Sequence, residues 1–411
     1  MRVQRRSLWS HADFCRLWGS DTISLFGLHA TLLALPLTAV SIEATTFQLS
    51  LLTTAQTAPA FLLGLFVGVW VDRRRRRPLL IGANIARAAL LTSVPVAAYF
   101  GILHLAQLYI VAFMSGIAAL VFVVAYQAFL PTVVPREQLI AGNSALRASE
   151  ATAQFVGPSV GGLLVQLLSA PLALTVGAVA SLGSALTILT IRTPEPCPHS
   201  DDEDIGVRRA IGEGIHFVLA DPILRPLLLS STLGALFSNL PTGIYILYAI
   251  HDLGISTATL GLIVGAGGLP ALLAALLTNR AVRRYGIGKT LIAASVVKAG
   301  ATLLLPLAGG PIPVAIALLL AWRMLASLAE AIGGIASFTL VQMIPPSGLQ
   351  GRVNATVRVC GWGAIALGGV LGGVAGTLFG LRPTLILAAL GTLLGPLWLI
   401  HSRVRQLHDP K

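Results

Sequence analysis

Two charged residues interrupt a strongly apolar part of the sequence. Arg323 and Glu330 lie seven positions apart in the apolar run 312–341, so they fall two turns apart on nearly the same face of a helix. A charged side chain at the centre of a bilayer costs on the order of 2.5–3.5 kcal/mol, so both must face inward. A carboxylate in this position can exchange a proton or bind a cation, and this chemistry couples an ion gradient to the movement of a substrate. The competing interpretation is a structural ion pair of Glu330 with Arg323 or Lys298.

Weaker candidates of the same kind lie in other apolar runs. Glu150 follows Arg147 by three residues, so the two can pair along one helix. Asp21 lies near the expected start of the first apolar run, where we expect it to cap the helix or to pair at the membrane surface. Asn239 and Tyr245 can line a cavity, although either can equally form a hydrogen bond between helices.

These side chains must be positioned by membrane-spanning helices. Of the 411 residues, 55% are hydrophobic and only 11% are charged, a composition outside that of soluble domains. Each membrane span needs about 20 apolar residues. Twelve such segments can be drawn, at 18–40, 47–71, 78–100, 104–130, 143–168, 171–191, 223–249, 257–279, 289–308, 312–341, 354–378 and 383–402. We therefore predict an all-α membrane protein with twelve transmembrane helices.

The distribution of basic residues predicts the topology. Five consecutive arginines, Arg73 to Arg77, separate the second span from the third, and the other basic turns fall on the same side of the membrane. The positive-inside rule makes that side cytoplasmic, which places both termini in the cytoplasm and the chain in the cell (inner) membrane. Basic residues confined to short turns do not form a groove that follows phosphates, so nucleic-acid binding is not expected. The three cysteines lie far apart, so neither a disulfide framework nor a metal site is expected.

An internal repeat organises the twelve spans into two halves. The offset of 211 residues that separates Asp72 from Arg283 also pairs Arg87 with Lys298, but it pairs Glu330 with Ala119. The same offset pairs Pro59 with Pro270, Asn143 with Asn354, Arg147 with Arg358, and Gly157, Gly161 and Gly162 with Gly368, Gly372 and Gly373. We predict six-helix bundles at residues 1–191 and 222–411, related by a pseudo-twofold axis along the membrane normal and joined by a cytoplasmic linker at 192–221. A substrate path is expected between the bundles.

Several motifs resemble those of one family. The pattern from Gly68 through Asp72 and Arg73 to Arg76 and Arg77 resembles the signature loop of the major facilitator superfamily. The sequences FCRLWGSDTIS, LPTVVPREQLIAGNSALR and GPSVGG resemble its bacterial exporters of macrolides and of enterobactin-type siderophores (the transmembrane secretion effectors). Leu28 and His29 stand where that subfamily often has an acidic residue after Gly27.

The resemblance implies roles for two of these motifs. It implies that Asp72 acts as a conformational latch against the start of the eleventh helix, near Asn354 and Arg358. The alternative is a surface pair of Asp72 with a neighbouring arginine. The arginine run either anchors the topology or also contacts acidic lipid head groups. Gly157, Pro158, Gly161 and Gly162 form an antiporter-type motif, and the resemblance implies a role in limiting proton leak beyond the close helix packing that glycines permit.

The sequence does not support an enzyme. It contains no GxSxG, HExxH or phosphate-binding loop, so no catalytic residues or cofactors are expected and energy must come from an ion gradient. We expect a monomeric secondary transporter that works by alternating access and contacts membrane lipids. It should export a moderately large amphipathic organic molecule, such as a drug, siderophore or secondary metabolite, in exchange for protons. A proton-coupled importer of the same fold and a non-transporting membrane sensor are the alternatives.

Overall fold

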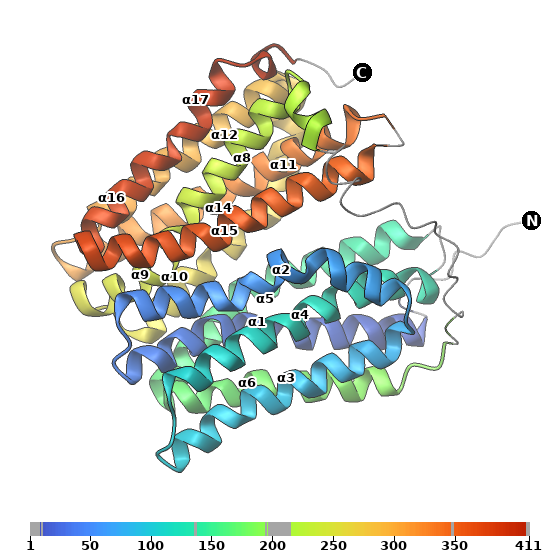
Figure 1. Cartoon of the computed structure of the whole chain (residues 1–411), viewed down its shortest axis with the longest axis vertical. Helices are drawn as coiled ribbons and strands as arrows, with labels where there is room; N and C mark the ends of the chain where they lie inside the picture. The colour runs from blue at the N-terminus through green and yellow to red at the C-terminus, as the bar shows by residue number, and fades with distance from the viewer. Residues whose placement is uncertain are drawn as a thin grey trace, which may run out of the picture. The chain divides into compact units, whose positions relative to one another are not determined.

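Every regular element in the described part of the chain is a helix (Figure 1). The computed structural model describes residue 9 and residues 11–134, 138–193, 195, 215–346 and 349–407. The first half contains α1 (Ala12–Ser41), α2 (Thr46–Asp72), α3 (Arg76–Tyr99), α4 (Leu105–Val133), α5 (Leu139–Leu167) and α6 (Ala170–Leu189). The second half contains α8 (Leu224–Asn239), α9 (Thr242–Leu247), the π-helix η3 (Tyr248–Asp252), α10 (Thr257–Ala266), α11 (Gly268–Tyr285), α12 (Ile287–Thr302), α13 (Leu304–Leu307), α14 (Ile312–Met343), α15 (Gln350–Phe379), α16 (Leu381–Thr392), α17 (Leu394–Ile400) and the 3-10 helix η4 (Arg403–Gln406).

The helices confirm the predicted twelve-helix layout. Among the described residues, nine helical segments are long and apolar enough to cross a membrane. Helices α2 and α5 and the pair α10–α11 supply the remaining three spans. The predicted linker is described only at 192, 193, 195 and 215–221, and residues 215–220 of it are helical.

The helix bounds repeat with the same offset as the sequence. Helix ends are set by local features such as glycines, charged turns and unpaired backbone groups, so a true repeat should conserve them. Four helices of the first half begin 211 residues before their counterparts, at positions 46 and 257, 76 and 287, 139 and 350, and 170 and 381. The repeat therefore appears in the helix boundaries as well as in the amino-acid sequence.

The two halves differ in whether prolines lie inside continuous helices or at breaks between helices. Proline removes a backbone donor from a helix and disturbs the preceding turn. In the first half, Pro36, Pro59 and Pro95 lie inside continuous helices. In the second half, Pro241 and Pro306 accompany breaks, between α8 and α9 and within the span α12–α13. The second half consequently crosses the membrane on more segmented helices.

Contacts group the helices into two compact units that do not follow chain order. Unit 1 comprises Met1–Glu43, Ala58–Asp201 and Thr257–Gly265, and unit 2 comprises Ala44–Thr57, Asp202–Ser256 and Ala266–Lys411. The beginning of α2 therefore packs in unit 2, and most of α10 packs in unit 1. Each unit has an apolar core. Fully buried members are Phe14, Phe129 and Ile188 in unit 1, and Leu224, Val353 and Leu399 in unit 2.

Candidate functional site

The candidate carboxylate Glu330 pairs with a lysine from a neighbouring helix. Its Oε1 atom on α14 lies 3.7 Å from Nζ of Lys298 on α12. The lysine side chain is 20% exposed and the glutamate side chain is 69% exposed, so the anion is the more accessible partner. Of the two ion-pair partners that the sequence left open for Glu330, the structure selects Lys298.

This ion pair lines a cavity inside unit 2. The cavity measures about 220 Å³ and lies among α8, α12, α14 and α17, with Ile365 of α15 and Thr392 of α16 completing its wall. Its other polar lining residues are Ser230, Ser231, Ser238, Asn239, Ser295 and Ser337. Apolar surface with a few polar groups is typical of a site for a small organic molecule. An ionisable pair that lines a cavity within the membrane is also the arrangement expected of an ion or substrate pathway.

Some polar groups of the cavity wall form hydrogen bonds within the protein, and others do not. Asn239 Nδ2 donates to the carbonyl of Ala235 at 2.9 Å, which leaves its side-chain oxygen available. Ser295 Oγ donates to the carbonyl of Leu291 at 3.0 Å. Ser238 Oγ is buried and has no hydrogen-bond partner among the described residues. The wall therefore offers hydrogen-bonding groups that its own helices do not fully use.

Arg323 and Tyr245 lie elsewhere in unit 2. A Cβ atom on Gly267 would lie 2.5 Å from Nε of Arg323, so this arginine packs tightly against the backbone between α10 and α11. The ring of Tyr245 is buried 5.2 Å from that of Trp322, and its hydroxyl has no hydrogen-bond partner among the described residues. Neither residue lines the cavity of Glu330. Arg323 and Glu330 lie on nearly the same face of the helix by their spacing, but only Glu330 lines the cavity.

The candidate carboxylates of unit 1 are close to each other. Asp21 interacts electrostatically with Glu150, and the adjacent residues link the two helices through a hydrogen bond of 3.2 Å from Thr22 Oγ1 to Ser149 Oγ. The expectation that Asp21 caps the first helix is wrong. Helix α1 begins at Ala12, nine residues before Asp21, so this aspartate is only 9% exposed and lies inside the helix. The side chain of Arg147 lies outside the described residues.

The glycines of the antiporter-type motif form close helix contacts. A Cβ atom on Gly161 of α5 would lie 3.1 Å from Cα of Ala30 on α1, and one on Gly162 would lie 2.9 Å from Cα of Gly261 on α10. Gly157 lies against His29 of α1 in the same way, and Pro158 lies within α5.

The repeat reproduces one of these contacts in the other unit. The offset of 211 residues maps Gly162 onto Gly373 and Gly261 onto Ser50, and a Cβ on Gly373 would lie 2.6 Å from Cβ of Ser50. Each crossing lies within a single unit. Close backbone approach at both crossings is therefore a shared property of the two copies.

The signature loop is only partly described. Helix α2 ends at Asp72, whose side chain lies outside the described residues, and Gly68 is half-buried. Arg73 is exposed, whereas the backbone N–H groups of Arg76 and Arg77 donate to Glu195 within unit 1. In unit 2, Asn354 is half-buried and the guanidinium of Arg358 lies 5.4 Å from the ring centre of Trp362. The latch stays a prediction.

Sequence reasoning overlooked most of the cavity wall. Serines and glycines such as Gly333, Gly334 and Gly395 carry little chemical signal by themselves. A position-by-position comparison of the two repeats would have shown them, because larger residues occupy several of the equivalent positions in the first half. No group of three or more His, Cys, Asp or Glu side chains that could hold a metal occurs among the described residues.

Comparisons with solved structures show which fold the chain has. The nucleoside transporter NupG matches with a TM-score of 0.78 at 13% identity over 94% of this chain and 99% of its own. A bacterial homologue of the iron transporter ferroportin, in an inward-facing state, matches with a TM-score of 0.75 at 16% identity over 96% of this chain and 99% of its own. These similarities show a shared fold, that of a polytopic membrane transporter.

The family follows from sequence comparison. The family model for transmembrane secretion effectors matches residues 7–410, so the chain belongs to that family of the major facilitator superfamily. Macrolide efflux protein A of Streptococcus pyogenes is 24% identical over 54% of this chain and 54% of its own length. The enterobactin exporter EntS of Salmonella typhi is 27% identical over 84% of this chain and 81% of its own length. The chain thus spans about half the length of its macrolide efflux relative. Its family and its solved structural neighbours are membrane transporters rather than enzymes.

Proposed function

We propose that the protein exports an amphipathic organic molecule in exchange for protons, with Glu330 as the proton-binding group. The observation that carries the proposal is the Lys298–Glu330 pair, which lines a cavity inside membrane-spanning helices. The functions of the two relatives, macrolide efflux and enterobactin export, support the outward direction. Drugs, siderophores and secondary metabolites all fit the proposed substrate class.

The ion pair supports a simple exchange step. When Glu330 is ionised, its carboxylate is neutralised by Lys298 at 3.7 Å. When a proton binds Glu330, the pair loses its attraction and the ammonium group is released toward the polar wall of the cavity. The two protonation states therefore present different surfaces to a substrate, which is the differential interaction that ligand-driven conformational change requires.

The available energy is sufficient for export. One proton that moves down a potential of 100 mV releases ~2.3 kcal/mol, which supports a roughly fifty-fold concentration ratio of substrate. The proposal places the chain in the inner membrane as a monomer with both termini in the cytoplasm. Basic residues such as Arg283, Arg284 and Arg403, which lie in connections on the side predicted to be cytoplasmic, support that orientation.

Transport in everted membrane vesicles tests the proposal. A susceptibility panel on cells that lack or overexpress the chain would first select a compound, beginning with macrolides. Labelled compound should then accumulate in everted vesicles when their interior is acidified, and substrate entry should release protons from the vesicles. Glu330→Gln should reduce the accumulation ratio by up to about fifty-fold, because the coupled charge is lost. Glu43→Gln, which removes an exposed carboxylate in the turn after α1, is the matched control and should transport normally.

The same assay separates the alternatives. Accumulation in right-side-out vesicles alone would identify an importer. Absence of flux across the whole panel, with the protein folded in the membrane, would favour a sensor. Normal coupling in the Glu330→Gln vesicles would remove Glu330 as the proton-binding group.

A further inference from the structure

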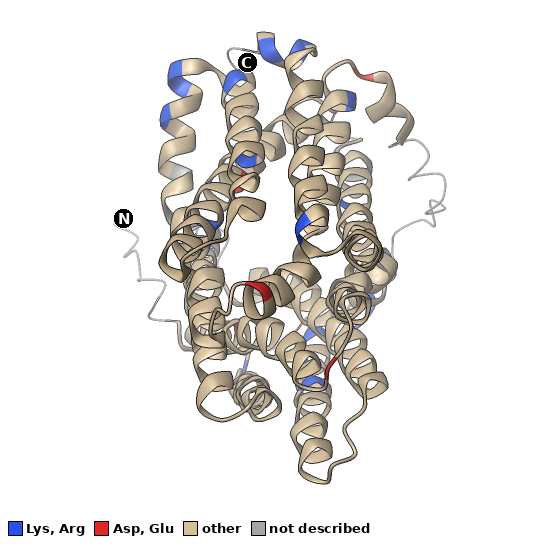
Figure 2. Ribbon diagram, turned by 90° about the vertical axis from the view of Figure 1, so that its left-hand side faces the viewer, with Lys and Arg blue, Asp and Glu red and all other residues tan. Residues whose placement is uncertain are grey.

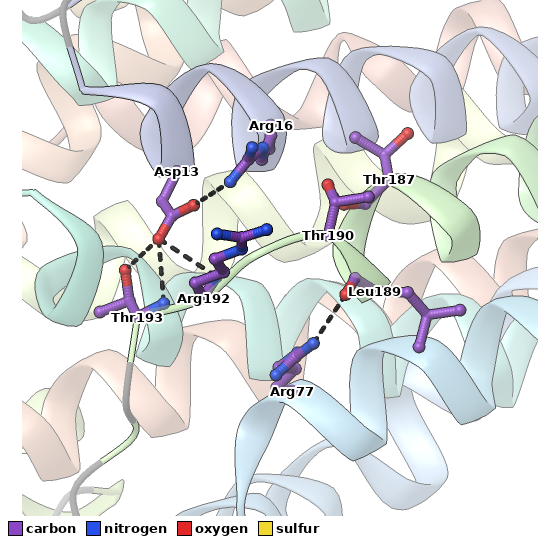
Figure 3. A network of polar contacts seen from close by, with 8 residues as sticks. All are labelled: Asp13, Arg16, Arg77, Thr187, Leu189, Thr190, Arg192 and Thr193. Carbon is purple, nitrogen blue, oxygen red and sulfur yellow. Dashed lines mark hydrogen bonds and ion pairs between the residues drawn. The ribbon is translucent and has the colours of Figure 1, made fainter.

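Two carboxylates at one end of unit 1 have partners inside the protein. Asp13 at the start of α1 accepts hydrogen bonds from Arg16 Nη1 at 2.7 Å, from the backbone N–H of Thr193 at 2.9 Å and from Thr193 Oγ1 at 2.6 Å (Figure 3). The second carboxylate, Glu195, accepts the backbone N–H groups of Arg76 and Arg77 at the start of α3. Arg77 also donates through Nη2 to the carbonyl of Leu189 at 2.8 Å (Figure 3).

These contacts form a closed arrangement within unit 1. The segment that follows α6 folds back onto the N-termini of α1 and α3, where the helix dipole favours an anion. Arg76 also lies 3.8 Å from Glu195. Part of the positive charge at this end of unit 1 therefore has a fixed partner inside the protein.

The repeat keeps this fold-back in unit 2 but removes both carboxylates. The offset of 211 residues maps Asp13 onto Leu224 and Glu195 onto Gln406. The chain after α17 still folds onto the start of the equivalent helix, because Gly288 N–H of α12 donates to the carbonyl of Leu407 at 3.2 Å. A neutral backbone carbonyl thus takes the place of the Glu195 carboxylate.

A cluster of exposed cations results at this end of unit 2. It comprises Arg280, Arg283, Arg284, Lys289, Arg403 and Arg405, which come from the end of α11, the start of α12 and η4, and all six are exposed. Figure 2 shows Lys and Arg positions gathered at helix ends of this unit, at the top of the view. Asp221, a carboxylate described near the start of α8, is already engaged, since its Oδ1 accepts the N–H groups of Ile223 and Leu224 at 2.8 Å.

The cluster lies at the level of lipid head groups. The span formed by α12 and α13 begins at Ile287, and the span formed by α16 and α17 ends at Ile400, so the cations immediately flank two membrane crossings. Tyr285 is 53% exposed, and the guanidinium of Arg284 lies 5.4 Å from the centre of its ring. Exposed tyrosine and flanking arginine are the residues that occupy the membrane–water interface.

We propose that this six-cation cluster is a binding surface for the phosphate head groups of acidic phospholipids. Several cations from three converging segments can contact one head group together. Among the described residues no carboxylate takes the place of Asp13 and Glu195, since Leu224 and Gln406 stand at the equivalent positions. The cluster binds lipid whichever direction the substrate moves, so the proposal stands apart from the proposed function.

Native mass spectrometry of the purified full chain tests the proposal. The probes are phosphatidylglycerol and cardiolipin, with phosphatidylethanolamine as the zwitterionic comparison, whose net charge is zero. The variant Arg283→Gln, Arg403→Gln, Arg405→Gln should bind the acidic lipids at least tenfold more weakly, since one cation near an anionic surface contributes roughly fivefold. The corresponding Lys variant should retain binding, and a thermal melt should show that both variants are folded.

A matched control removes the same number of cations from unit 1. Arg73, Arg74 and Arg75 are equally exposed but lie in a single turn next to the Glu195 contacts, so their replacement by Gln should weaken lipid binding less than the unit 2 variant does. Equal loss in this control, or unchanged affinity in the unit 2 variant, would overturn the proposal. Displacement of lipid by millimolar inorganic phosphate would also overturn it in favour of a free-anion site. A tenfold gain in lipid binding after Asp201, Asp202, Glu203 and Asp204 are replaced by their amides would indicate instead that the linker occupies the cluster.

Discussion

At the level of Arg87, polar side chains of unit 1 bond to one another, whereas the equivalent residues of unit 2 line a cavity. Asn84 Nδ2 donates to Ser184 Oγ at 2.7 Å, and Ser184 Oγ shares a second hydrogen bond of 2.7 Å with Ser20 Oγ. The 211-residue offset maps this triad onto residues of the cavity wall, namely Ser295, Gly395 and Ser231. A smaller residue replaces Asn84, and the central hydroxyl of the triad is lost altogether.

Aromatic residues reinforce the same difference. In unit 1 the rings of Phe122 and Tyr126 stack with centres 5.9 Å apart, and both side chains are buried. Their counterparts in unit 2 are Gly333 and Ser337, which line the cavity. Two large rings therefore become two small side chains at equivalent places in an equivalent helix. This loss of side-chain volume leaves space for the cavity that Gly333 and Ser337 line in unit 2.

The charged residues near these positions also differ between the two units. Arg87 of unit 1 is 3% exposed and has no carboxylate at position 119, where the sequence has Ala. Its counterpart Lys298 has Glu330 at the position equivalent to Ala119. One copy of the repeat thus has a buried arginine at this level, and the other copy has an ion pair that lines a cavity. The two copies share their helix boundaries, and a few side-chain differences account for the ion pair and the cavity in the second copy.

The largest effect on stability is expected when Tyr126 of unit 1 is replaced by serine, the residue that its counterpart Ser337 has in unit 2. Tyr126→Ser should lower the free energy of unfolding by about 3 kcal/mol, because a buried ring is lost and the surrounding helices close the void only in part. The measurement is equilibrium unfolding of the purified protein in detergent. Ser337→Ala is the matched change in unit 2 and should cost well under 1 kcal/mol, since it borders a cavity. Similar losses for both variants would contradict the contrast between the two units.

The reverse exchange should impair transport rather than stability. Ser337→Tyr places a large ring in the cavity of unit 2, so substrate flux should fall about tenfold, equivalent to ~1.4 kcal/mol of lost interaction. Stability should stay within about 1 kcal/mol of the parent, because the side chain enters existing space. Flux in vesicles and a thermal melt measure the two quantities. Full transport by a folded Ser337→Tyr protein would show that substrate does not use this cavity.

The smallest effect concerns the hydrogen-bonded triad. A double-mutant cycle of Asn84→Ala and Ser184→Ala should give a coupling energy of about 0.6 kcal/mol, the average for side-chain hydrogen bonds inside membrane proteins. The equivalent cycle of Ser295→Ala and Ser231→Ala in unit 2 should give a coupling close to zero, because those residues border the cavity. Unfolding free energies of the four single and two double variants decide the comparison. Equal coupling in both units would remove the triad as a reason for the difference.

Much of the fold was predictable, and parts of the site were not. The apolar runs and the single offset predicted twelve helices in two repeats, because span length and charge placement are local properties of the chain. The position of Asp21 was predicted wrongly because the polar first turns of α1, from Ala12, extend the helix beyond its apolar run. Glu330 was found as a charge in an apolar helix, yet its partner stayed open between Arg323 and Lys298. Choosing between them requires knowing which face of α14 meets α12.

The sequence by itself determined the class of molecule, the number of crossings and the duplication, since each depends on composition and on spacing along one chain. Tertiary structure alone decided that Lys298 pairs with Glu330, that Gly333 and Ser337 line a cavity, and that the carbonyl of Leu407 accepts the N–H of Gly288 at the start of α12. Cavities and ion pairs depend on which faces of separate helices meet. That information is set by the packing of side chains from distant segments, and no single segment contains it.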